Sequence, residues 1–147
     1  MRRIFTSVAL FAFGIIRLAM GQDLTHTKDS LETVKSNFKE GKAVIVDVRE
    51  QGEWDAGHLK GAMLMPMSKL KKEDQAAEML KALPKDKIVY THCKAGKRAL
   101  ACGEILKKQG FDVRPLRPGY EELLKAGFEF KFPSWTGAAR ELVRRHG

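Results

Sequence analysis

The sequence predicts an α/β fold in which helices cover both faces of a parallel β-sheet. Short runs of β-branched and other apolar residues recur along the chain, separated by segments with apolar residues at helical spacing. Apolar runs of this length without polar alternation are typical of strands buried on both faces. Strands that alternate with helices in this way imply a parallel sheet with helical crossovers.

The first half of the expected fold contains a helix, two strands and a second helix. A helix over 31–38 begins after Ser30, whose hydroxyl can cap the first turn. Residues 43–46 are an uninterrupted apolar run and predict a buried strand. A second short run, 62–65, stops at a proline, and the apolar stripe over 76–83 predicts a helix that also ends before a proline.

The second half repeats the pattern with a more pronounced helix. The apolar run at 88–90 predicts a strand that extends to residue 92, and a helix over 97–109 ends at a glycine. A strand over 113–116 and a short helix over 120–126 complete the alternation. Three phenylalanines alternate over 128–132 without predicting a definite element.

The ends of the chain are expected to lie outside the folded domain. Residues 1–21 have a basic start, an apolar stretch and small residues at positions 19 and 21, which is the layout of a signal peptide. Cleavage after residue 21 would leave the protein periplasmic or secreted, with no stable membrane insertion. Arg17 late in the apolar stretch leaves an uncleaved anchor as the alternative. We expect a domain over 22–136 and a basic tail over 137–147, either helical or frayed.

Composition excludes several classes of protein. The chain has 147 residues, of which 44% are hydrophobic, enough for one core and too many for a disordered chain. Two cysteines are too few for a disulfide framework, and no metal-ligand spacing accompanies them, so no metal is expected. The net charge is +9, but the lysines are scattered without interleaved aromatic residues. Nucleic-acid binding is therefore not expected, whereas a small anionic substrate fits the charge.

The loop that begins at Cys93 carries the residue types expected of a reactive site. Cys93 follows the predicted strand 88–92, and parallel sheets bind ligands at the carboxyl ends of their strands. A glycine in the loop permits a positive φ, so that successive backbone N–H groups can face one centre. The following helix N-terminus and three cations favour a thiolate in a cradle for an anion. The loop residues are Lys94, Ala95, Gly96, Lys97 and Arg98.

Four motifs in order make the chain resemble a single-domain rhodanese, a sulfurtransferase. The similarity covers roughly residues 25–128, and its motifs lie at 46–50, 53–62, 92–98 and 110–113. The resemblance implies a rhodanese-like sheet, with Cys93 as the nucleophile that takes the outer sulfur of thiosulfate, releases sulfite and holds a persulfide. A thiol or a protein would accept the sulfur, and no organic cofactor would be required.

The resemblance also assigns roles to residues around Cys93. The backbone amides of 94–98 would cradle the persulfide, and Arg98 would position the loop and the anion. Asp47 and Arg49 would help to hold the active face together. Two departures from the family pattern are Trp54, where Phe or Tyr is usual, and Lys60, where Pro is usual. We expect the first to be tolerated and the second to loosen the turn.

Other cysteine and histidine residues are interpreted as structural. Cys102 lies at the centre of the apolar face of its predicted helix, which indicates a buried, inert thiol. His92 precedes Cys93 but should face the opposite side of the sheet, so it is not expected to act as its base. His58 is also expected to be structural. His26 shows no sequence signal of a function.

Three functions remain open at this point. The first is an exported rhodanese that uses thiosulfate or a similar donor. The second is a non-enzymatic module that receives persulfide from a partner protein. The third, a phosphatase or arsenate reductase, is disfavoured because rhodanese-like phosphatases have one more residue between the cysteine and the arginine.

Overall fold

The centre of the fold is a sheet of four parallel strands. The computed structural model describes residues 23–132, so the predicted signal peptide (1–21) and basic tail (137–147) lie outside the described residues. The strand order is β3-β1-β4-β5, with every neighbouring pair parallel. The strands are β1 (Ala43–Asp47), β3 (Met63–Leu64), β4 (Ile88–His92) and β5 (Asp112–Pro115).

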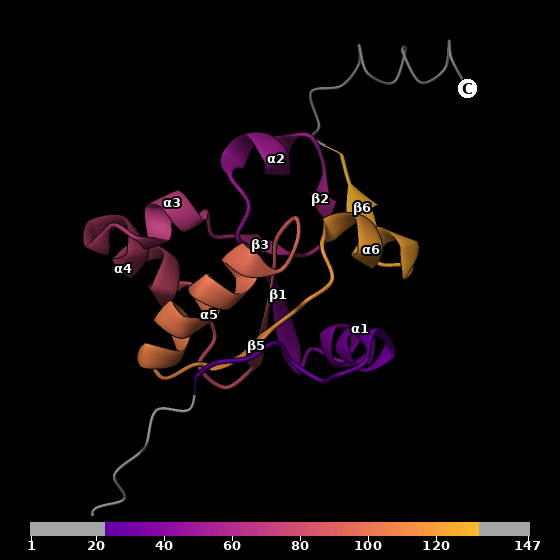
Figure 1. Ribbon diagram of the computed structural model, residues 1–147, viewed down its shortest axis with the longest axis horizontal. Helices are drawn as coiled ribbons and strands as arrows, with labels where there is room; N and C mark the ends of the chain where they lie inside the picture. The colour runs from indigo at the N-terminus through magenta and orange to yellow at the C-terminus, as the bar shows by residue number, and fades with distance from the viewer. Residues whose placement is uncertain (1–22, 133–147) are drawn as a thin grey trace, which may run out of the picture.

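Helices cover both faces of this sheet, as the sequence predicts (Figure 1). On one face lie α1 (Leu31–Lys39) and α6 (Tyr120–Lys125). On the other face lie α3 (Met67–Leu70), α4 (Glu73–Lys81) and α5 (Lys97–Lys108). Among the described residues, no helix is long and apolar enough to cross a membrane.

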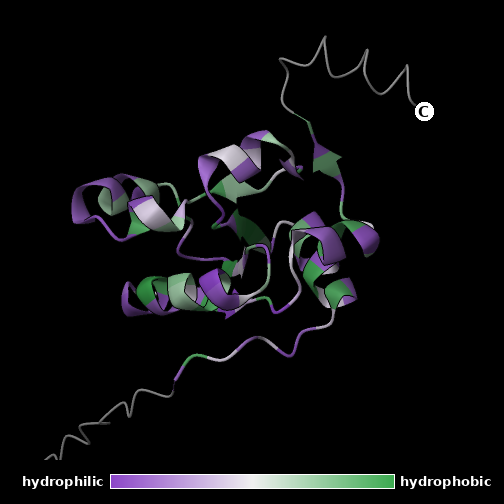
Figure 2. Cartoon of the chain, turned by 45° about the horizontal axis from the view of Figure 1, so that its top comes forward, coloured by the Kyte–Doolittle hydropathy of each residue, from purple (hydrophilic) through white to green (hydrophobic). Residues whose placement is uncertain are grey.

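Two apolar clusters, one on each face, hold the helices against the sheet. Successive side chains of a strand point to opposite faces, so Val46 and Val89 pack against α4 and α5, while Ile45 and Tyr90 pack against α1 and α6. Figure 2 shows apolar residues in the strands at the centre of the fold and helices that combine apolar with hydrophilic residues. The same alternation decides which way the residues at the strand ends point.

A smaller set of elements lies beyond the carboxyl end of β1. The short helix α2 (Gln51–Asp55) is followed by β2 (His58–Leu59), which pairs antiparallel with β6 (Phe130–Lys131). The elements α2, α3, β2 and β6 were not predicted from the sequence. Each has two to five residues, too few for a helical or strand period to show, and β2 and β6 pair across a long stretch of chain.

The predicted helix over 76–83 differs in its bounds from α4. The helix begins at Glu73, where two acidic residues occupy the first turn, and ends at Lys81. Leu83 belongs to the apolar stripe but lies in the following loop, where it is still buried. The N–H of Leu83 donates to the carbonyl oxygen of Leu80 at 3.2 Å, so the buried stripe continues into one further turn after α4.

Candidate active site

Cys93 lies where the sequence analysis places it, directly after β4 and four residues before α5. Gly96 is the N-cap of α5 and has φ +81°, which is the positive φ expected at this position. Because glycine has no side chain to cap the helix, the first N–H groups of α5 are open to a ligand. Cys93 is only 2% exposed and lies in the apolar cluster beside α5. A sulfur donor must therefore be small enough to reach a recessed sulfur.

The N-terminus of α6 packs against the loop that follows Cys93 and holds it in place. The backbone N–H of Tyr120 donates to the carbonyl oxygen of Cys93 at 2.9 Å. Gly119 packs so closely that a Cβ atom there would lie 1.8 Å from the carbonyl oxygen of Lys94. The φ of Gly119 is −84°, so close approach and not backbone conformation makes glycine necessary.

Arg98 is bound by a carboxylate of α2. Its Nη1 donates to Oε2 of Glu53 at 2.6 Å, and its Nη2 donates to Oε1 at 2.9 Å. These hydrogen bonds lower the pKa of Glu53 to about 2, against the opposing effect of burial. The N–H of Glu50 also donates to Oε2 of Glu53. Arg98 thereby joins the start of α5 to α2, so its guanidinium is already paired with a protein anion.

Asp47 and Arg49 form a buried ion pair at the end of β1. The Nη2 of Arg49 donates to Oδ2 of Asp47 at 2.7 Å and to the carbonyl oxygen of Gly57 at 2.8 Å. The guanidinium lies 3.9 Å from the centre of the Tyr120 ring, in cation–π contact. The pair thus connects β1, the turn after α2 and the start of α6. All three segments surround the loop at Cys93.

His92 is buried beside Asp47, and its side chain lies on the face of the sheet opposite to that of the Cys93 side chain. The two residues are partners in the register of β1 and β4, and Nε2 of His92 lies 3.7 Å from Oδ2 of Asp47. Burial lowers the pKa of His92 to about 4, although the charge of Asp47 opposes this shift. His92 is therefore neutral near pH 7. Its place on the opposite face agrees with the expectation that it is not the base for Cys93.

The other residues considered in the sequence have structural surroundings. Cys102 is completely buried, and burial raises the pKa of its thiol to about 12. Both cysteines are free thiols. The His58 ring stacks on Trp54 with 3.6 Å between centroids, and its Nδ1 donates to the carbonyl oxygen of Trp54.

Lys60 does not loosen its turn as expected. Its backbone N–H donates to the carbonyl oxygen of Glu129 at 2.8 Å, a bond that proline cannot make. Its Nζ also forms an ion pair with Glu129 at 2.8 Å. Lys60 thus adds a connection between β2 and the segment before β6.

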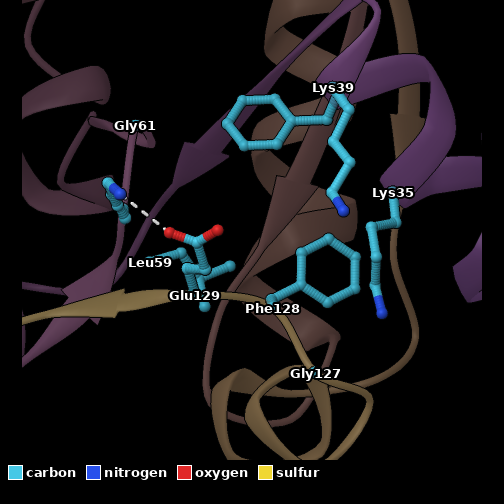
Figure 3. A pocket seen from close by; sticks show the side chains of 9 residues that line it. Lys35, Lys39, Leu59, Gly61, Gly127, Phe128 and Glu129 are labelled. Carbon is cyan, nitrogen blue, oxygen red and sulfur yellow. Dashed lines mark hydrogen bonds and ion pairs between the residues drawn. The ribbon is translucent and has the colours of Figure 1, made fainter.

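Two cavities differ in their relation to Cys93. One, of about 280 Å³, opens beside the loop and is lined by Lys94 together with residues of the surrounding segments, Arg49, Glu53, Gly57, Tyr120 and Glu121. The other, of about 310 Å³, lies between α1 and the chain around Phe128, and Lys35 and Lys39 line it (Figure 3). The Nζ of Lys35 lies 5.4 Å from the centre of the Phe128 ring. The second cavity contains none of the predicted site residues. The first is therefore the candidate entrance to the site.

The structure brings the predicted site residues together and adds three that sequence reasoning missed. Lys94, Ala95 and Lys97 are exposed on the loop, while Asp47, Arg49 and Gly96 are buried around it. The missed residues are Glu53, Gly119 and Tyr120. Glu53 lies inside a family motif, but nothing in the sequence indicates that it pairs with Arg98. Gly119 and Tyr120 were missed because a glycine before a helix is an ordinary helix start. No described group of three His, Cys, Asp or Glu side chains is arranged to hold a metal ion.

The geometry defines an α/β protein with a cysteine loop at the carboxyl end of a central parallel strand. The family model of the rhodanese-like domain matches residues 30–126. This chain therefore belongs to the rhodanese-like domain family, and the resemblance drawn from the sequence is confirmed. Family membership supports a general role in sulfur transfer.

Relatives of known name agree with this assignment. The chain is 37% identical over 70 residues to the probable adenylyltransferase/sulfurtransferase MoeZ of Mycobacterium tuberculosis, a match that covers 48% of this chain and only 17% of the relative. The human single-domain sulfurtransferase TSTD1 is 29% identical, with a TM-score of 0.55 over 66% of this chain and 94% of that one. The Helicobacter pylori protein hp1203 is 31% identical, with a TM-score of 0.56 over 74% and 91%.

Proposed function

We propose that this protein is an exported sulfurtransferase that moves sulfur from thiosulfate, or a similar anionic donor, to a thiol through a persulfide on Cys93. The observation that carries the proposal is the position of Cys93 at the entrance to an uncapped helix N-terminus formed through Gly96. The N–H groups and positive end of α5 suit a sulfur anion at this point. The loop length, one residue shorter than in the phosphatases of this fold, favours sulfur over phosphorus chemistry.

The proposed reaction has two displacement steps. In the first, the Cys93 thiolate attacks the outer sulfur of thiosulfate, the S–S bond of thiosulfate breaks, and sulfite leaves with the electron pair. In the second, an acceptor thiolate attacks the outer sulfur of the Cys93 persulfide, and Cys93 leaves as a thiolate. The sulfur is carried covalently at each stage. No external oxidant or reductant is consumed.

The surroundings of Cys93 suit each partner in this reaction. Lys94 and Lys97 are exposed on the loop and attract a dianionic donor. The cavity beside Lys94 provides room for a small anion and, later, for an acceptor. Arg98 would act mainly by fixing the loop, because both of its terminal nitrogens are bound to Glu53.

The first experiment measures thiocyanate formation from thiosulfate and cyanide by residues 22–147. Cys93→Ala should abolish turnover, whereas Cys102→Ala, which removes the other buried thiol, should retain it. Absence of turnover in folded, reduced wild-type protein would exclude a thiosulfate enzyme. Mass spectrometry after incubation with a persulfide-bearing protein would then test the carrier function, and phosphate release from an aryl phosphate would test the third class.

Export is proposed from the first 21 residues alone. The full-length chain, expressed in a bacterium, should accumulate in the periplasmic or extracellular fraction with Gln22 as its first residue. N-terminal sequencing of the fractionated protein measures both points. A membrane-bound product that retains Met1 would instead indicate an uncleaved anchor.

A further inference from the structure

The segment before α1, residues 23–29, lies against β5 and α5 and is called the N-terminal strap below. The N–H of Thr27 donates to the carbonyl oxygen of Pro115 at 2.8 Å. Leu24 packs on Gly103 of α5, where a Cβ would lie 2.6 Å from a methyl group of Leu24. The strap is outside residues 30–126, which match the family model. These contacts bring it to the outer side of the loop at Cys93.

One strap residue contacts the loop itself. The Nε2 of His26 lies 3.2 Å from the carbonyl oxygen of Gly96. A carbonyl oxygen only accepts, so Nε2 carries the hydrogen and donates it. The same oxygen accepts the N–H of Leu100 at 3.1 Å. A Cβ on Gly96 would lie 2.8 Å from the carbonyl oxygen of Arg117 and 3.1 Å from Nε2 of His26, so the loop is enclosed on both sides.

This contact fixes the orientation of a peptide group at the site. In a trans peptide the C=O of one residue and the N–H of the next point in opposite directions. With its oxygen held by His26 and Leu100, the Gly96 carbonyl points along α5. The N–H of Lys97 must then point out of the helix N-terminus, at the end where Cys93 lies. This N–H is one of those that would bind a sulfur anion.

We infer that His26 is a positioning residue for sulfur transfer, which acts by holding the Gly96–Lys97 peptide in the orientation that the Cys93 persulfide requires. The inference rests on the proposed function for its catalytic consequence. A hydrogen-bond donor held in a fixed orientation stabilises the charge that develops in the transition state more than it stabilises bound thiosulfate. Loss of the hydrogen bond should therefore reduce kcat more than it raises the KM for thiosulfate.

The test compares His26→Phe, which keeps a ring without a donor, with His26→Gln, which restores a donor nitrogen on a side chain of similar reach. Thr25→Ala, at an exposed neighbouring position, is the matched control. His26→Phe should lower kcat about three- to tenfold, which is the effect of one lost hydrogen bond. His26→Gln should recover most of this loss, and Thr25→Ala should match wild type.

A second measurement separates this inference from the proposed function. The rate of Cys93 alkylation by iodoacetamide, followed by mass spectrometry, needs no sulfur donor, and it should also fall in His26→Phe and recover in His26→Gln. If wild-type protein shows no turnover, the thiosulfate reaction fails and the alkylation rates still decide the role of His26. Equal rates in all four proteins would overturn the inference. Equal losses of rate in His26→Phe and His26→Gln, together with a lowered Tm, would also overturn it, because they would indicate a general structural role.

Discussion

Arg98 of α5 and Glu53 of α2 face each other through two hydrogen bonds, of 2.6 and 2.9 Å. Both side chains are about one-third exposed, so the pair lies at the edge of the site. The pair joins the helix that follows Cys93 to the helix that follows β1. Arg98 is therefore positioned by a residue 45 positions earlier in the chain, which makes Glu53 part of the site.

Glu53→Gln should weaken sulfur transfer without abolishing it. The neutral amide keeps one acceptor for Arg98 but loses the charge and the second acceptor, so kcat/KM should fall about fivefold, equivalent to about 1 kcal/mol. Glu78→Gln, which breaks the exposed Glu78–Lys81 pair on α4, is the control and should have no effect. Unchanged kcat/KM in Glu53→Gln would show that Arg98 needs no anchor.

The same variant should alter the acid sensitivity of folding. The pKa of Glu53 is about 2 in the folded protein, below its ordinary value of 4.5. Its contribution to stability is therefore present above pH 4.5 and is lost as the pH falls from 4.5 toward 2. The Tm difference between wild type and Glu53→Gln should shrink over this range. A difference that stays constant with pH would contradict the prediction.

Gly119→Ala should disable the site. Its Cβ would lie 1.8 Å from the carbonyl oxygen of Lys94, so the loop or α6 must move. We expect the rate of thiocyanate formation to fall at least 100-fold, with a loss of about 1–3 kcal/mol in the free energy of unfolding. Gly52→Ala in α2 is the control, because its Cβ would meet no atom within 4 Å. Near-normal turnover in Gly119→Ala would mean that the loop tolerates displacement.

Arg49→Met should destabilise the protein strongly. Asp47 is completely buried and Arg49 is 5% exposed, so the substitution leaves a buried carboxylate without its counter-charge. The expected loss in urea denaturation is about 3–5 kcal/mol. Lys42→Met breaks the surface pair with Glu40 and should change stability by less than about 1 kcal/mol. Equal effects of the two substitutions would argue against a buried ion pair.

His92→Asn should change the pH dependence of stability but not that of the Cys93 reaction. The pKa of His92 is lowered from 6.5 to about 4 in the folded state. Its neutral ring therefore favours folding above pH 6.5, and this contribution is lost as the pH falls toward 4. Thermal unfolding of His92→Asn should vary less over this range than that of wild type. The pH profile of Cys93 alkylation should stay the same, and a shifted profile would indicate that His92 acts on Cys93.

The sequence predicted the sheet, its covering helices and the cysteine loop because each has a local signal. Runs of apolar residues mark β1 and β4, and a glycine before a helix marks the turn after Cys93. The anchors of the site have no such signal. His26 and Glu53 contact the loop or its helix across 70 and 45 residues of chain. Tertiary folding alone brings them together, so periodicity and motif spacing did not indicate these contacts.

The contacts that fix the loop at Cys93 involve its main-chain carbonyl oxygens. Those of Cys93 and Gly96 accept hydrogen bonds from Tyr120 and His26, and Gly119 packs against that of Lys94. The side chains of Lys94, Ala95 and Lys97 remain exposed. Replacing them would change the charge and size of the entrance while the curvature of the loop persists. Selectivity for donors and acceptors is therefore separable from the geometry of the nucleophile, and related proteins could diverge in substrate by surface substitution alone.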